Sequence, residues 1–128
     1  MEKKTGFICG FLHVFCALSY SIQGLFTGLK LSLALRQEFF IFILLAFLAW
    51  FTERSFLETF CSLSGWGLVM IAELFNSAIE ETLDLITRDY SPHVKAAKDM
   101  GSAAVFLLVV MNIFGQCFLY YPVFFGNI

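Results

Sequence analysis

The sequence predicts an all-α integral membrane protein, with three transmembrane helices and an N-terminal amphipathic surface helix in a single membrane domain spanning residues 1–128. Of the 128 residues, 59% are hydrophobic and 14% are charged, and the mean hydropathy is +0.82. Soluble domains carry about 25% charged residues, so this chain has too few charges to cover a soluble globule. A formal net charge of -2 without a dominant basic patch excludes a nucleic-acid binder, and the high hydrophobicity excludes a disordered chain.

The segment of about residues 7–29 predicts the surface helix. Its polar residues recur at helical spacing and form one stripe, which comprises His13, Cys16, Tyr20, Gln23 and Thr27. An apolar helix with one polar stripe suits a position along the membrane surface. The alternative is a signal peptide, with Lys3 and Lys4 as its positively charged region. The polar stripe continues past the expected cleavage site at residues 17–19, which favours the surface helix.

The transmembrane helices are expected at about residues 33–52, 56–80 and 100–124, because a span needs about 20 mostly apolar residues. A short polar turn at residues 52–55 separates the first two spans, and a charged loop from Asp84 to Asp99 separates the last two. Of the Lys and Arg residues, only Arg54 lies on the opposite side from the N-terminus and the second loop. Positively charged loops stay in the cytoplasm, which predicts a cytoplasmic N-terminus.

The cysteines indicate no metal or disulfide framework. They lie far apart and form no C-x-x-C pair or Cys/His cluster, at Cys9, Cys16, Cys61 and Cys117. We expect buried apolar thiols.

Carboxylates in the inner half of the second predicted span carry the functional prediction. At about 100° per residue, one helix face holds Glu73, Asn76, Ser77, Glu80 and Asp84. Carboxylates at membrane depth are costly and normally face a protein interior or a wet cavity. Glu73 lies about 10 Å deeper than Glu80, which suits a general base or a proton carrier.

Carboxylates nearer the water suit a hard cation such as Mg²⁺. For Glu80 and Asp84 the alternative is a solvated helix end without chemistry. For Glu81, which points off the polar face, that alternative is the favoured interpretation.

The third predicted span opens with Lys98 and Asp99, which we place at a helix N-terminus, where backbone N–H groups favour anions. Lys98 can add a positive charge for phosphate. The alternative is an ordinary snorkelling lysine with a capping aspartate. The small residues 101–104 allow close helix approach, and Asn112 and Gln116 are expected to form hydrogen bonds between helices.

Two long motifs resemble those of the prokaryotic diacylglycerol kinase family: Glu73-Leu-Phe-Asn-Ser-Ala-Ile-Glu80 and Ala97-Lys-Asp-Met-Gly-Ser-Ala-Ala-Val105. Asp84, Tyr20-Ser21 with Gly24, and Arg36-Gln37-Glu38 match at the expected distances, so the resemblance covers nearly the whole chain. It implies homotrimers with composite active sites at subunit boundaries, in the bacterial cytoplasmic (inner) membrane. It also implies phosphorylation of a lipid alcohol with ATP as co-substrate and Mg²⁺ as cofactor.

The resemblance also implies roles for individual residues. Glu73 matches the catalytic base and Glu80 the metal-binding carboxylate. The positions that match nucleotide-binding residues are Tyr20, Glu80, Asp84, Asp89, Tyr90, Lys98 and Asp99. The positions that match lipid-binding residues are Gln37, Glu38, Glu73, Asn76 and Ser102. The expected reaction is transfer of the γ-phosphoryl group of MgATP to the primary hydroxyl of diacylglycerol, which gives phosphatidic acid.

The chain departs from the family pattern at a few positions. Ser32 stands where the family usually supplies a second metal-binding carboxylate, His13 where an arginine often meets nucleotide, and Asp89 where a glutamate is common. A hydroxyl supplies an oxygen but no charge, which predicts weaker metal binding. The alternatives are therefore a weakly active or non-catalytic membrane protein, or an undecaprenol kinase of the same family. Arg36-Gln37-Glu38 favours the diacylglycerol branch.

Overall fold

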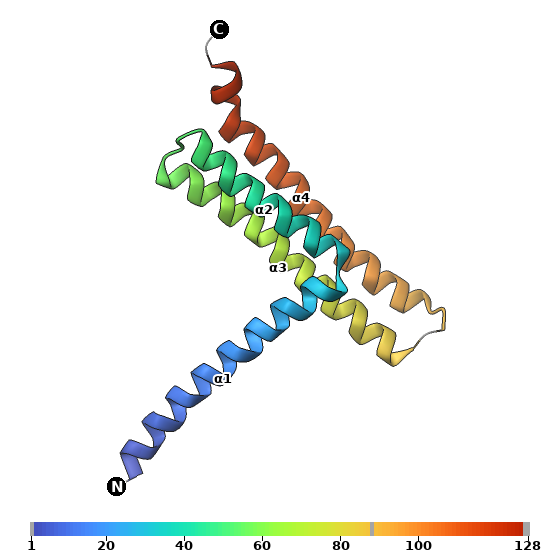
Figure 1. The fold of residues 1–128 in the computed structure, drawn as a ribbon. Helices are drawn as coiled ribbons and strands as arrows, with labels where there is room; N and C mark the ends of the chain where they lie inside the picture. The colour runs from blue at the N-terminus through green and yellow to red at the C-terminus, as the bar shows by residue number, and fades with distance from the viewer. Residues whose placement is uncertain (1, 88, 127–128) are drawn as a thin grey trace.

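The structure, a computed structural model, describes residues 2–87 and 89–126, with side chains from residue 13 onward. Within these residues it consists of the helices α1 (Glu2–Leu31), α2 (Leu33–Phe51), α3 (Phe56–Ile86) and α4 (Pro92–Phe125), and it contains no strand (Figure 1). The predicted all-α membrane fold is confirmed. Each described helix has a segment long and apolar enough to cross a membrane, including His13–Leu31 of α1. The surface position of α1 therefore stays a prediction.

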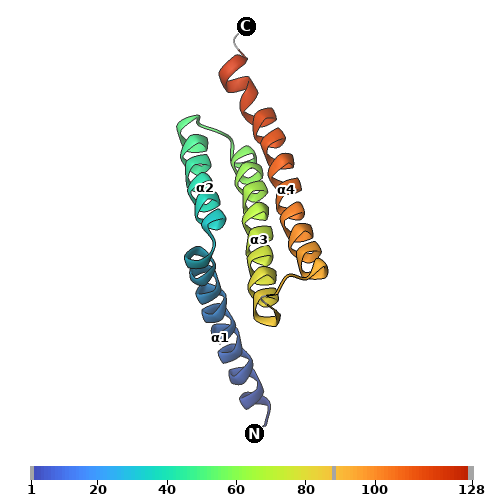
Figure 2. The same cartoon turned by 90° about the vertical axis from the view of Figure 1, so that its right-hand side faces the viewer.

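Helix α3 is the centre of the bundle. It packs against α2 and α4, and Figure 2 shows it between them. Helix α1 leaves the bundle at a steep angle, as Figure 1 shows, and among residues 13–31 only Gly28 is buried. A Cβ atom at Gly28 would lie 2.6 Å from Leu74 Cδ2 and 3.0 Å from Leu35 Cδ2. The glycine therefore lets the end of α1 approach α3 closely.

Serine side chains begin two of the helices. Ser32 has an extended backbone and separates α1 from α2. Its Oγ accepts a hydrogen bond from Leu35 N at 3.1 Å. Ser55 begins α3 with a capping box, in which its Oγ accepts from Glu58 N and the Glu58 carboxylate accepts from Ser55 N. Such caps satisfy backbone N–H groups that the first helical turn leaves unpaired. The turn predicted at residues 52–55 is confirmed.

The predicted charged loop from Asp84 to Asp99 is wrong, because most of it is helical. Helix α3 continues to Ile86 and α4 begins at Pro92, where proline at the first helical position presets the backbone. With 31 residues, α3 is about 46 Å long, which exceeds a hydrocarbon core of about 30 Å. The charges thus mark where the helices leave the apolar layer. Lys98 and Asp99 lie about two turns inside α4 and not at its N-terminus.

Amide side chains connect α3 to α4, as predicted. Asn112 Nδ2 donates a hydrogen bond to Gly65 O at 2.9 Å. Gln116 Nε2 donates to Ser62 O at 3.0 Å, and Ser62 Oγ donates to Gln116 Oε1 at 2.8 Å. These bonds satisfy polar groups in a region without water.

The expectation of buried cysteines is wrong for the described thiols. Cys16, Cys61 and Cys117 are exposed on the single chain, and Cys9 lies outside the residues whose side chains are described. An apolar thiol gains little from burial when the surface of the helix faces lipid.

We expect Gly65→Ala to destabilise the bundle by about 1–3 kcal/mol, the range for overpacking a filled core. A Cβ atom at Gly65 would lie 2.5 Å from Asn112 Oδ1 and would displace the amide that bonds Gly65 O. Thermal unfolding in detergent measures the loss. Gly67→Ala is the matched control, because a Cβ atom there meets nothing within 4 Å. Equal unfolding temperatures for the two variants would contradict this packing.

Candidate active site

A polar cavity of about 310 Å³ lies between the junction of α1 with α2 and the C-terminal half of α3. It is lined by Leu31, Ser32, Leu33, Ala34, Glu73, Ser77, Glu80, Glu81 and Asp84. The structure thus brings the predicted polar face of α3 to one cavity, with the exception of Asn76. Glu81, which we expected to point away, is exposed but contributes to the same lining.

Glu73 faces the protein interior, as its position within the second predicted span indicated. Its residue surface is only 7% exposed. Its Oε1 accepts a hydrogen bond from Ser32 Oγ at 2.9 Å and a longer one from Ser77 Oγ at 3.3 Å. The Ser32 contact joins α3 to the start of α2, and no sequence pattern indicated it.

Glu38 is a second buried carboxylate, and it lies near enough for its charge to interact with that of Glu73. Among the described residues its Oε2 has no hydrogen-bond partner. The backbone carbonyl of Glu38 accepts a hydrogen bond from Trp66 Nε1 at 2.9 Å. This bond fixes α2 against α3 about two helical turns from Glu73.

Asn76 orients Glu80 from a buried position. Its Nδ2 donates a hydrogen bond to Glu80 Oε1 at 3.1 Å. A Cβ atom at Gly101 would overlap Asn76 Oδ1, so the glycine lets α4 pack directly against this amide. Gly101 therefore allows the close helix approach that the sequence predicted, and it packs against the Asn76 amide that contacts Glu80.

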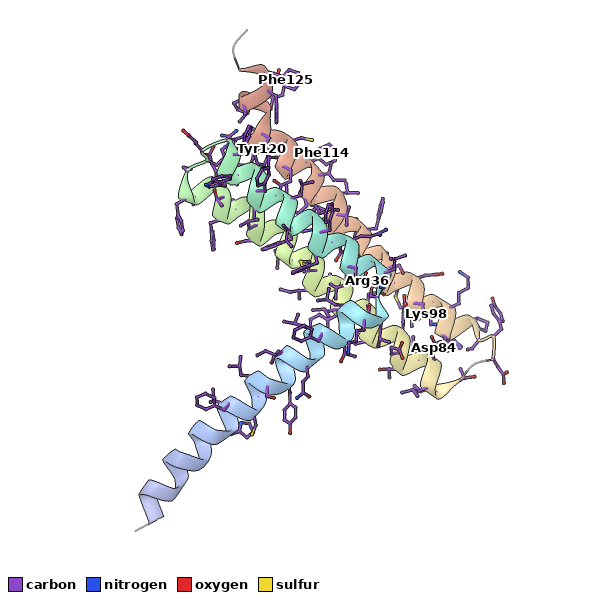
Figure 3. All side chains as sticks on the ribbon, in the orientation of Figure 1. Arg36, Asp84, Lys98, Phe114, Tyr120 and Phe125 are labelled. Atoms are coloured by element: carbon purple, nitrogen blue, oxygen red, sulfur yellow. The ribbon has the colours of Figure 1, made fainter. Side chains whose placement is uncertain are left out.

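Lys98, on α4, contacts Asp84 of the cavity lining. Its Nζ forms an ion pair with Asp84 Oδ1 at 2.6 Å, and Figure 3 shows the two side chains together near the α3–α4 connection. Asp99 does not join them. It pairs instead with Lys95 on its own helix, with 2.6 Å between Nζ and Oδ2.

The remaining predicted site residues line no part of this cavity. All of them are exposed on the single chain: Tyr20, Gln37, Asp89, Tyr90, Asp99 and Ser102. Tyr20 lies on α1, and Asp89 and Tyr90 lie in the connection between α3 and α4. Gln37 and Ser102 lie on α2 and α4.

The donor set fits a Mg²⁺ ion that arrives with a nucleotide. Among the described residues no group of three or more His, Cys, Asp or Glu side chains could hold a metal ion by itself. Mg²⁺ commonly takes one or two carboxylates and completes its shell with waters and phosphate oxygens. Glu80 and Asp84 supply two carboxylates at the cavity, of which Asp84 is paired with Lys98.

Comparisons with known proteins identify the family of this chain. A family model described as prokaryotic diacylglycerol kinase matches residues 19–120. The diacylglycerol kinase of Escherichia coli strain K12 is 34% identical over 110 residues, which cover 86% of this chain and 90% of the relative. The diacylglycerol kinase of Haemophilus influenzae is 36% identical over 107 residues, which cover 84% of this chain and 87% of the relative. The chain therefore belongs to the prokaryotic diacylglycerol kinase family, a family of lipid kinases.

Proposed function

We propose that this lipid kinase transfers the γ-phosphoryl group of MgATP to the primary hydroxyl of diacylglycerol and gives phosphatidic acid. The observation that carries the proposal is the burial of Glu73 on the helix face that also presents Glu80 and Asp84 to one cavity. The names of the relatives support diacylglycerol as the acceptor. The Arg36-Gln37-Glu38 sequence supports the same branch.

In-line phosphoryl transfer depends mainly on positioning and on neutralising negative charge. Glu73 takes the proton of the lipid hydroxyl as the hydroxyl oxygen bonds to the γ-phosphorus and the bond to the β–γ bridging oxygen breaks. Lys98 balances charge on the transferring group once nucleotide competes for it with Asp84. Glu80 would hold Mg²⁺, which would supply positive charge to the phosphates of the nucleotide.

The depth of the two glutamates suits a lipid acceptor. Glu73 and Glu80 are about two helical turns apart, or about 10 Å along α3. Glu80 lies nearer the α3–α4 connection, and Lys95 and Lys98 add positive charge in the first two turns of α4. This arrangement fits a hydroxyl that waits at the membrane interface while ATP arrives from the cytoplasm.

The family resemblance implies a homotrimer with composite sites, and this arrangement accounts for the predicted site residues that lie outside the cavity of one chain. Tyr20, Asp89 and Tyr90 lie outside the cavity of one chain, but a neighbouring copy could bring such residues to it. We place the protein in the bacterial cytoplasmic membrane because its relatives are bacterial diacylglycerol kinases. The distribution of Lys and Arg favours a cytoplasmic N-terminus.

Labelled ATP tests the proposed reaction. The purified protein is mixed with diacylglycerol and undecaprenol in detergent micelles with Mg²⁺, and the lipids are separated after reaction. We expect label in phosphatidic acid. Label in undecaprenyl phosphate alone would identify undecaprenol as the acceptor. Label in neither lipid would contradict the kinase activity.

A further inference from the structure

We propose that Ser32 is a positioning residue for Glu73. Its hydroxyl holds one oxygen of the Glu73 carboxylate, so that the other oxygen is presented to the hydroxyl of the lipid. The inference rests on the proposed kinase function, and it assigns to Ser32 a role that differs from metal binding.

The two hydrogen bonds at Ser32 Oγ determine the direction in which its hydroxyl proton points. The Oγ atom accepts the Leu35 N–H at 3.1 Å, as the cap of α2. Leu35 is 1% exposed, so this donor is fixed in the packed core. A serine hydroxyl carries a single proton, and here that proton is donated to Glu73 Oε1 at 2.9 Å. The helix cap therefore orients the hydroxyl toward the carboxylate.

Ser32 provides the only hydrogen bond between the Glu73 carboxylate and another helix or junction among the described residues. Ser77 also donates to Oε1, but Ser77 lies one turn away on α3 and moves with Glu73. Neither hydroxyl donates to Oε2, and no other described residue does. When a residue outside α3 donates a hydrogen bond to one oxygen of the carboxylate, the second oxygen points in a defined direction. That second oxygen is the proton acceptor.

A hydroxyl suits this position better than an acid in this chain. Glu38 is a second buried carboxyl group, and its charged form interacts unfavourably with that of Glu73. A carboxylate at position 32 would add a third, whereas the serine adds a donor without charge. The departure from the family pattern at Ser32 thus changes what the position supplies, from a charge for a metal to a hydrogen bond for the base.

Two substitutions at Ser32 separate the hydrogen bond from the helix cap. Glycine retains most of the capping preference of serine, whereas it removes the donor to Glu73. We expect Ser32→Gly to lower kcat by about 10-fold or more, the scale of a hydrogen bond to a charged group, with little change in the KM for ATP. Ser32→Thr keeps a hydroxyl and is expected to recover most of the turnover.

Ser55→Ala is the matched control. It removes a serine cap from α3 at the opposite end of the bundle, where Ser55 contacts Glu58 and not the cavity. We expect parental kcat and KM from this variant. Parental kcat in Ser32→Gly, or equal losses in Ser32→Gly and Ser32→Thr, would overturn the role of the hydroxyl.

Infrared spectroscopy of protein labelled with ¹³C-glutamate provides a readout that does not require turnover. The carboxylate band of Glu73 is the one that disappears in Glu73→Gln. We expect this band to shift in Ser32→Gly and to stay in place in Ser55→Ala. If the band shifts in Ser32→Gly but the parent protein phosphorylates no lipid, the contact between Ser32 and Glu73 is supported and the proposed function is rejected. An unshifted band in an active enzyme would reject this inference alone.

Discussion

Glu73→Gln is expected to lose lipid phosphorylation by about 10²- to 10⁴-fold, the range that a general base contributes. The amide has nearly the shape of the carboxylate, and its oxygen can still accept the hydrogen bonds from Ser32 and Ser77. The variant therefore keeps the packing of the buried side chain but cannot take up the proton of the lipid hydroxyl. The initial rate of label transfer from ATP into phosphatidic acid measures the effect.

The control for this prediction is Glu53→Gln, which makes the same chemical change in the exposed turn between α2 and α3. It should retain parental turnover. The unfolding temperatures of both variants should match that of the parent, because neither change removes packed volume. Parental turnover in Glu73→Gln would show that the buried carboxylate is not the base.

The face of α3 could be predicted because it depends only on helical spacing. Glu73, Glu80 and Asp84 recur at intervals that place them on one side of any helix, whatever packs against it. The amides of Asn112 and Gln116 were also predictable, because a polar side chain in an apolar span needs a partner on another helix. The structure identifies those partners as Gly65 O and Ser62.

The lengths of α3 and α4 could not be inferred from hydropathy. Hydropathy indicates which part of a helix lies within the apolar layer, but it does not show whether the helix continues beyond that layer. Residues 93–98 include alanine and lysine, which are strong helix formers. Their charges led to a loop prediction, and the position of Lys98 at a helix N-terminus was wrong for this reason.

The contacts that complete the site are separated by long stretches of chain. Ser32 and Glu73 are 41 residues apart, and their hydrogen bond depends on where α1 ends and how α2 packs against α3. Lys98 meets Asp84 across the connection between α3 and α4. The sequence identified each residue by type and position, but no local pattern specifies which of them form pairs.

Glu80→Gln is expected to weaken Mg²⁺-dependent nucleotide binding and turnover more than any other change at the outer part of the cavity. Ser32 supplies no charge, and Asp84 is shared with Lys98, whose Nζ lies 2.6 Å from Asp84 Oδ1. Glu80, oriented by Asn76, is therefore the main carboxylate left for the cation. Loss of an outer-shell partner alone costs about 10- to 100-fold in metal affinity, so the Mg²⁺ concentration for half-maximal activity should rise by at least about that factor. Titration of turnover with Mg²⁺, and equilibrium dialysis of MgATP, measure the two effects.

Glu81→Gln is the matched comparison, because it removes the same charge from the next residue of α3. The side chain of Glu81 is exposed and forms no hydrogen bond or ion pair with a described residue, whereas that of Glu80 accepts the Asn76 amide. The glutamine at position 80 can still accept that bond, so a change in the Mg²⁺ requirement would reflect the lost charge and not lost packing. We expect a small shift in Glu81→Gln, since exposed charges interact weakly. Equal shifts in the two variants would indicate a diffuse effect of negative charge and would remove the assignment of Glu80 as the metal ligand.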